Sequence, residues 1–331
     1  MNLPPEDFVR VSEEDELEFL SLCLQNAGMA SDHAAVVSRL LTNSDLRGVR
    51  SHGIGWAPGY CRHYNEGRHN PEPDMHVVHD TASTVIVDGD GALGYVPSVM
   101  ATELAIGKAK ASGVSLGLVR HIGHYGAAGH YTRMCKDAGC IGFSVQGFRP
   151  GEGAPRDPKP SAGFTGAPPM SFAIPGGDEP GIVLDMVAHA MSGYNAPQFE
   201  DLLERVPAAF FKSMGLVAAA MMIGGPLTGF TLPEADDVAE RWGAATLGGT
   251  ILVIDVAAVV PPEEYARQVD GYVRSIRNNY APLPGYDEVL LPGHVEERIM
   301  AQHRREGIRF GEREQQAAQQ MSDEFGVSVP W

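Results

Sequence analysis

The sequence predicts an α/β protein in which a helical lobe precedes a lobe built on a sheet. Short apolar segments typical of buried strands alternate with helical segments through the middle of the chain. Upstream of them, residues 12–48 show helical patterns only. The 331 residues are 44% hydrophobic and 20% charged, so the chain is long enough to bury a core and to divide into two lobes.

Two helices are expected in the N-terminal lobe. Residues 12–29 open with Ser12 ahead of acidic residues, which favours a helix start, and Gly28 ends the segment. The second helix begins at Ser31, a good N-cap, and ends near Gly48. It delivers the chain to the tripeptide Ser51-His52-Gly53.

An extended, proline-containing stretch at residues 71–79 marks the first expected boundary between the lobes. Beyond it, four apolar segments predict short buried strands, separated by helices such as residues 98–111 and 127–137. The four segments are TVIVDG, VSLGLVR, CIGFSVQ and GIVLDM.

The second half of the chain predicts an ordered loop at residues 148–169, which hold six prolines and four glycines. Helices follow at residues 198–224 and 262–278, on either side of the clear strand GGTILVIDVAAVV. Residues 295–325 predict two helices broken near Gly307. We therefore expect three parts, with the last returning to the first lobe: residues 1–74, 75–250 and 251–331.

Composition excludes several classes of protein. With 25 basic against 42 acidic side chains, the formal charge is −17, and such a surface repels phosphate backbones, so no nucleic-acid partner is expected. The longest apolar stretches are shorter than the ~20 residues that cross a bilayer, so no membrane partner is expected either. The acidic N-terminus does not resemble a signal peptide, which favours the cytoplasm. The four cysteines lack paired metal spacing and predict buried, reduced thiols.

One motif has the form of a dinucleotide fingerprint, Gly89-x-Gly91-x-x-Gly94, between an apolar strand and a helix. Its context is wrong, because Asp88 and Asp90 would place negative charge beside a pyrophosphate. The next strand also ends at His121 without an acid that could bind a ribose. We therefore interpret the motif as a tight turn capped by Asp90.

Two other segments have more suitable chemistry. His52 can exchange a proton near neutral pH, and the adjacent Ser51 can hold its imidazole. The segment GHYGAAGHYTRMCKDAG follows the strand VSLGLVR, at the end of a strand where open α/β sheets hold ligands. Its glycine-rich helix start could bind a phosphate through free backbone N–H groups, although a close strand-to-helix turn explains it equally well.

Taken in order, seven motifs resemble the malate/L-lactate dehydrogenase family, which includes ureidoglycolate, diketogulonate, sulfolactate and cyclic-imine enzymes. The resemblance spans nearly the whole chain. It implies an α/β fold with an N-terminal helical lobe, a NAD(P)-binding lobe that is not of the Rossmann type, and a homodimer. The motifs are SDLRGVRSHG, DGDGALG, HIGHYGAAGHY, GAPPMSFAIP, VLDM, KSMGL with GGPLTG, and LLPGHVEERIMAQHRREGI.

The resemblance also implies roles for individual residues. His52 would be the general acid/base with Ser51 as its partner, and Asp185 matches an acid at the end of the active-site strand. The cofactor, NAD or NADP, would lie near His124, Gly126, Tyr131 and Lys212. Taken alone, Asp185 could equally be a strand-end acid that accepts backbone N–H bonds, and Lys212 a solvated helix residue.

The sequence departs from the family where substrate would bind. Relatives carry an arginine three residues beyond the SHG glycine, suited to a substrate carboxylate, but Trp56 stands here and an indole cannot form that clamp. The family's GTNP becomes GAPP, a serine becomes His189, and the segment before Lys212 is shortened. The arginine that binds a substrate anion is thus left open among Arg47, Arg50, Arg62, Arg149 and Arg156.

The expected activity is hydride transfer between nicotinamide and a small polar substrate, at a carbon bearing oxygen or nitrogen, with His52 moving the proton. Trp56 favours a ring or apolar group over a simple 2-oxo acid. The alternative is non-redox acid/base chemistry, or metabolite binding, on the same scaffold, with His52, His124 and His189 facing the substrate. No metal site is expected, because the histidine spacing matches no compact helical ligand pair.

Overall fold

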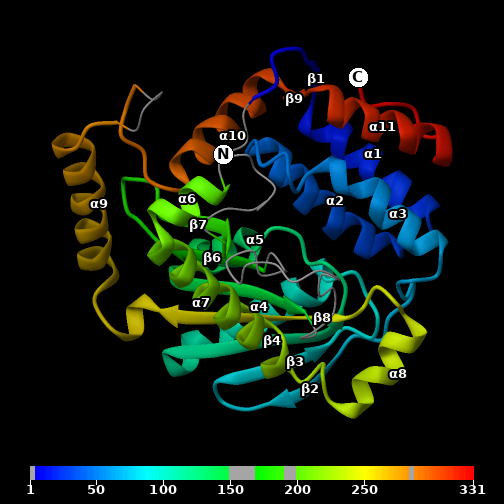
Figure 1. Cartoon of the computed structure of the whole chain (residues 1–331), viewed down its shortest axis with the longest axis horizontal. Helices are drawn as coiled ribbons and strands as arrows, with labels where there is room; N and C mark the ends of the chain where they lie inside the picture. The colour runs from blue at the N-terminus through cyan, green and yellow to red at the C-terminus, as the bar shows by residue number, and fades with distance from the viewer. Residues whose placement is uncertain (1–3, 149–167, 190–198, 283–286) are drawn as a thin grey trace.

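The computed structural model describes residues 4–148, 168–189, 199–282 and 287–331, and it is built on a seven-stranded mixed sheet (Figure 1). The strand order is β2-β3-β4-β8-β5-β6-β7. Among the described strands only β3 and β4 pair in parallel, so this is not the parallel sheet of a Rossmann domain. The strands are β2 (His76–Asp80), β3 (Thr84–Asp88), β4 (Val114–Ile122), β5 (Cys140–Phe148), β6 (Pro169–Ile174), β7 (Ile182–Val187) and β8 (Leu247–Asp255).

Helices cover both faces of the sheet. Glycines at odd and even positions of one strand lie on opposite faces. A Cβ atom at Gly142 of β5 would meet Cys135 of α5 (Gly129–Asp137), whereas one at Gly147 would meet the backbone of Gly224 in α7 (Pro207–Gly224). Helix α4 (Tyr95–Ser112) packs on β3, β4 and β8 and also contacts α5. The layer of α4 and α5 therefore lies opposite α7.

The helical lobe combines both ends of the chain. In Figure 1 the first helices lie beside the last ones, above the sheet. Strand β1 (Val9–Val11) pairs with β9 (Ile308–Phe310), and α2 contacts both α4 and α10. The C-terminal helices and β9 thus pack with the first helices of the chain. The helices of this lobe are α1 (Glu13–Asn26), α2 (Ser31–Leu46), α3 (Ala57–Asn65), α10 (His294–Glu306) and α11 (Glu312–Phe325).

Most predicted elements are confirmed, and the differences have physical causes. Strand β6 was not predicted, since a loop was expected up to residue 169 and no strand after it; the segment is a strand because it pairs between β5 and β7. The predicted boundary at residue 250 falls inside β8, which lies mid-sheet between β4 and β5. The helix expected over 198–224 is two, α6 (Phe199–Arg205) and α7, separated just before Pro207. The loop expected over 148–169 lies largely outside the described residues. The remaining helices are α8 (Pro233–Arg241) and α9 (Pro262–Asn279).

The fingerprint-like turn has no room for a pyrophosphate. A Cβ atom at Gly91 would lie 2.3 Å from the Trp242 ring, and one at Gly94 would lie 2.6 Å from the Gly123 carbonyl oxygen. Asp90 has a φ of 44° and accepts a hydrogen bond of 2.9 Å from the Asn70 amide. The glycines are therefore needed for close packing within the chain, as the turn interpretation expects.

Candidate functional site

The Ser51-His52-Gly53 loop is fixed from beneath by a buried carboxylate. Asp45, near the end of α2, accepts a hydrogen bond of 2.6 Å from the Ile54 backbone N–H. A Cβ atom at Gly53 would lie only 1.9 Å from Asp45 Oδ1, so the loop can approach this carboxylate only with glycine at that position. Asp45 thereby sets the height and direction of the backbone that carries His52.

A second acid lies against Asp45. Burial raises the pKa of Glu16 well above its ordinary value, and the Asp45 charge raises it further. Burial also raises the pKa of Asp45 to about 7, against the lowering effect of its hydrogen bonds with Glu16 and Ile54. The pair therefore holds a proton near neutral pH, which lets two carboxyl groups share one dry space under the loop.

His52 is held as a neutral imidazole. Its Nδ1 lies 3.0 Å from Ser51 Oγ. Burial lowers the pKa of His52, and the positive charge of Arg313 lowers it further. In the tautomer in which Nδ1 donates to Ser51 Oγ, Nε2 is an acceptor at neutral pH. The geometry therefore suits a general base that takes a proton from a substrate hydroxyl.

The sheet lobe adds His124 to this group. The His124 ring stacks on Trp56 with centroids 4.8 Å apart and lies 5.8 Å from the His52 ring. Its Nδ1 shares a hydrogen bond of 2.6 Å with the Tyr60 hydroxyl. Burial lowers the pKa of His124 to about 3, with the nearby His52 as a second cause, so the ring stays uncharged. Trp56 is 39% exposed, and the uncharged rings of Trp56, His124 and Tyr60 pack together beside His52 as an aromatic wall.

Tyr60 and Tyr95 belong to the site but were missed in the sequence. Tyr60 shares a second hydrogen bond, of 3.2 Å, with Tyr95 at the start of α4. The signal was partly visible, because Tyr60 follows Trp56 by four residues and therefore occupies the same face of a helix. Tyr95 carried no such signal, since only the fold brings α4 to α3.

Gly126 and Tyr131, expected near the cofactor, shape the loop between β4 and α5. Gly126 has a φ of 77°, and a Cβ atom there would lie 2.5 Å from the Tyr95 ring. Tyr131 is buried, and its hydroxyl donates to the Tyr125 carbonyl oxygen at 2.5 Å. Both residues therefore fix the loop that follows His124, and the Tyr131 hydroxyl is already engaged.

Asp185, His189 and Lys212 occupy other positions. Burial raises the pKa of Asp185 to about 6, although Arg133, 3.9 Å away, and the Gly129 backbone lower it. The Asp185 carboxylate therefore lies against Gly129, the first residue of α5. This is the helix start that could bind a phosphate according to the sequence. His189 is partly buried just after β7. Lys212 is exposed on α7, across the sheet from α5, so the structure does not bring it to His52.

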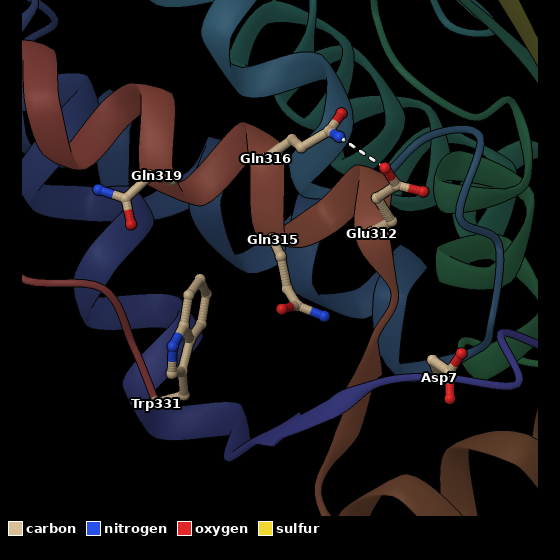
Figure 2. Close-up of a pocket in the computed structure, with 6 residues that line it drawn as sticks. All are labelled: Asp7, Glu312, Gln315, Gln316, Gln319 and Trp331. Atoms are coloured by element: carbon tan, nitrogen blue, oxygen red, sulfur yellow. Dashed lines mark hydrogen bonds between the residues drawn. The ribbon is translucent and has the colours of Figure 1, made fainter.

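Among the residues that the structure describes, no metal centre competes with this group, and the surface hollow does not include it. Within the described part of the chain, no three His, Cys, Asp or Glu side chains converge as metal ligands. The hollow of about 370 Å³ in Figure 2 lies on the outer side of α11, and Gln316 donates to Glu312 within it. It contains none of the residues around His52. Its lining is Asp7, Glu312, Gln315, Gln316, Gln319 and Trp331.

Comparison with known proteins gives a consistent result. The model of the family described as malate/L-lactate dehydrogenase matches residues 11–200 and 200–318. The chain is 27% identical to L-sulfolactate dehydrogenase of Methanocaldococcus jannaschii, over 96% of this chain and 97% of the relative. It is 28% identical to the NAD(+) ureidoglycolate dehydrogenase of Escherichia coli O157:H7, over 91% and 92%. The structure of malate dehydrogenase from Pyrococcus horikoshii OT3 superposes with a TM-score of 0.85 at 23% identity, covering 99% of each chain.

Proposed function

Because the chain belongs to the malate/L-lactate dehydrogenase family, we propose that it is a nicotinamide-dependent dehydrogenase of a small hydroxy acid, with His52 as its acid/base. The family match and the dehydrogenase relatives support an oxidoreductase over the non-redox alternative. One observation carries the assignment of His52. His52 is a neutral imidazole that hydrogen-bonds Ser51, and it lies beside the aromatic wall at the junction of the two lobes.

The residues around His52 fit a nicotinamide in charge and polarity. Trp56 and His124 are uncharged aromatic rings next to His52, and burial keeps His124 from protonation, so no fixed charge of these rings opposes the nicotinamide. Bound there, a nicotinamide supplies the acceptor or donor of the hydride. The fingerprint-like turn at Gly89 does not fit the pyrophosphate, because the chain itself fills it.

The proton follows a path through the protein's own groups. In the oxidative direction His52 Nε2 accepts the substrate hydroxyl proton while Nδ1 donates to Ser51. The imidazolium that forms then returns its proton to solvent, and in the reductive direction it gives the proton to the new hydroxyl oxygen. Trp56 bounds the substrate on one side, and this aromatic surface favours a substituent that is planar or apolar.

Binding of NADH and NADPH to the purified protein tests the proposed class. We expect one of the two to bind at micromolar to low millimolar concentration, as followed by cofactor fluorescence and by calorimetry. Absence of binding of either at millimolar concentration would remove the nicotinamide from the account. The same titration chooses between NAD and NADP.

A pH profile tests the protonation state of His52. Because its folded pKa lies below 6.5, we expect kcat/KM for oxidation to be level above neutral pH and to fall as the pH drops through that lowered pKa. For reduction the imidazolium is needed, so kcat/KM falls as the pH rises through the same pKa. The acid limb should remain in Asp185→Asn, although Asp185 itself has a pKa of about 6. A limb that vanishes in Asp185→Asn would assign the proton transfer to that carboxyl group.

A homodimer is part of the proposal, and α7 supplies the candidate surface. Helix α7 is long and apolar enough to cross a membrane by length and composition, yet one side packs on β5. Its opposite side carries an exposed stripe at helical spacing, Phe211, Gly215, Ala218 and Met222, with Phe211 71% and Met222 47% exposed. Of the methionines considered from the sequence, Met221 is in the core and Met222 is in this stripe.

We expect Met222→Glu to convert the dimer to a monomer, because a charge would be buried against the partner's apolar stripe. Light scattering at micromolar concentration measures the mass. Gln320→Glu on α11 is a suitable control, because that side chain is exposed. Met100→Glu on α4 is not, because Met100 packs against the core. A wild-type chain that is already monomeric would contradict this surface.

Cytoplasmic location is likewise proposed, supported by four buried, unpaired cysteines.

A further inference from the structure

The first turn of α11 is fastened to the loop that carries His52. Glu314 is only 1% exposed and receives two hydrogen bonds from Arg50, at 3.0 Å and 2.6 Å. The same carboxylate accepts the Gly311 backbone N–H at 3.0 Å, which closes the start of the helix. Since Arg50 directly precedes Ser51, this paired contact fixes where residues 311–314 lie relative to His52.

Arg313 extends from this fixed turn to the same loop. A Cβ atom at Gly55, next to Trp56, would lie 3.0 Å from Arg313 Nε and 3.2 Å from its Nη2. The guanidinium therefore lies against the backbone at Gly55, between His52 and Trp56 in the chain. The lowered pKa of His52 agrees with this position, because burial is its first cause and the Arg313 charge its second.

Arg313 is also uncommitted, unlike its neighbours. It is exposed, and within the described residues no hydrogen bond or ion pair engages its guanidinium. Arg47 is paired with Glu297 at 3.0 Å, and Arg50 with Glu314. Arg62 follows Tyr60 by two residues on α3, which turns it about 200° away from the face that bears Tyr60.

We propose that Arg313 binds the anionic group of the substrate, a carboxylate or a sulfonate, and so determines which hydroxy acids are accepted. This inference rests on the proposed function and names its substrate class more closely. The planar guanidinium suits two parallel hydrogen bonds to such a group. With the anion on Arg313, the substrate hydroxyl lies toward His52 and its substituent toward Trp56, so three contacts orient one small molecule.

Kinetics with a matched pair of substrates test the role. For 3-phenyllactate, Arg313→Gln should lower kcat/KM by about 10- to 100-fold, mostly through KM, because one charge-assisted contact is lost. For the uncharged amide of 3-phenyllactate, the same substitution should change kcat/KM little. Arg313→Lys should fall between the two, since it keeps the charge without the fork. Arg267→Gln is the control, because Arg267 is exposed on α9, at the far side of the molecule from α11, and pairs within its own helix (Figure 1).

Binding of an unreactive anion separates this inference from the proposed activity. Oxamate, titrated by calorimetry with and without reduced cofactor, should bind the wild-type protein and the Arg267→Gln variant alike, and about 10-fold or more weakly to Arg313→Gln. Equal affinity of oxamate for wild type and Arg313→Gln overturns the role of Arg313. So does the absence of binding to wild type at about 10 mM oxamate, which is on the order of the weakest specific complexes. Cofactor binding and turnover that persist in that case leave the dehydrogenase itself intact.

Discussion

Replacing His52 by asparagine should lower kcat by about 10²- to 10⁴-fold while the protein still melts cooperatively near the wild-type temperature. Asparagine occupies a similar volume and can still hydrogen-bond Ser51, so the loop over Asp45 has no reason to move. It cannot take up a proton at neutral pH, however, and the substrate hydroxyl then has no base. Steady-state rates and a thermal melt of the same preparation measure both effects.

His63→Asn is the matched control for that change. His63 is also a partly buried histidine of the helical lobe, and its Nε2 contacts Arg68 rather than the aromatic wall. We expect its rate to stay within a factor of about two of wild type, as is usual for changes away from a site. Unchanged turnover in His52→Asn would remove the proposed acid/base and leave a family member without an assigned proton path.

Of the glycine-to-alanine changes in the helical lobe, Gly53→Ala should lower stability and activity the most. The added Cβ atom would lie 1.9 Å from Asp45 Oδ1, so either the loop or the buried carboxyl group must move. Overpacking and the lost Asp45–Ile54 hydrogen bond each cost about 1–3 kcal/mol in free energy of unfolding. A displacement of about 1 Å at His52 is enough to cost about 10²-fold in rate.

Gly107→Ala provides the comparison for this substitution. Gly107 lies in α4, is exposed, and would meet nothing within 4 Å of an added Cβ atom. Alanine there should raise the free energy of unfolding by about 0.5–1 kcal/mol, because glycine is a poor helix former. Denaturant melts of both variants, with activity assays, measure the contrast. Wild-type stability and activity in Gly53→Ala would show that Asp45 does not fix the loop.

Much of this arrangement could be predicted from the sequence, because it depends on local patterns. The helices and apolar strands follow from periodicity, and Ser12 caps α1 as predicted, whereas Ser31 is the first residue of α2 and not its N-cap. The SHG tripeptide and the glycine-rich segment at His124 were both predicted as parts of a site. The α/β fold and the family were also correct. The glycine fingerprint was interpretable because its acids are visible in the sequence.

Contacts between distant segments could not be predicted. Arg313 and Glu314 reach the loop only because α11 returns to α3, and no local pattern near residue 313 indicates a site. Lys212 is a different case: a motif predicted it near the cofactor, its helix covers the face of the sheet opposite α5, and its role stays a prediction. Buried pairs such as Glu16 and Asp45 are likewise absent from the pattern, because each acid taken alone resembles an ordinary helix residue.

Transfer of deuterium from substrate to cofactor tests the central claim most directly. Malate, lactate and 3-phenyllactate, each deuterated at C2, would be incubated with the protein and oxidised nicotinamide cofactor, and the reduced cofactor examined by mass spectrometry. We predict that at least one of these acids yields reduced cofactor carrying a single deuterium, with His52→Asn forming it about 10²- to 10⁴-fold more slowly. Conversion of the acids without deuterium in the cofactor, or no cofactor reduction with any of them, would contradict hydride transfer at this site.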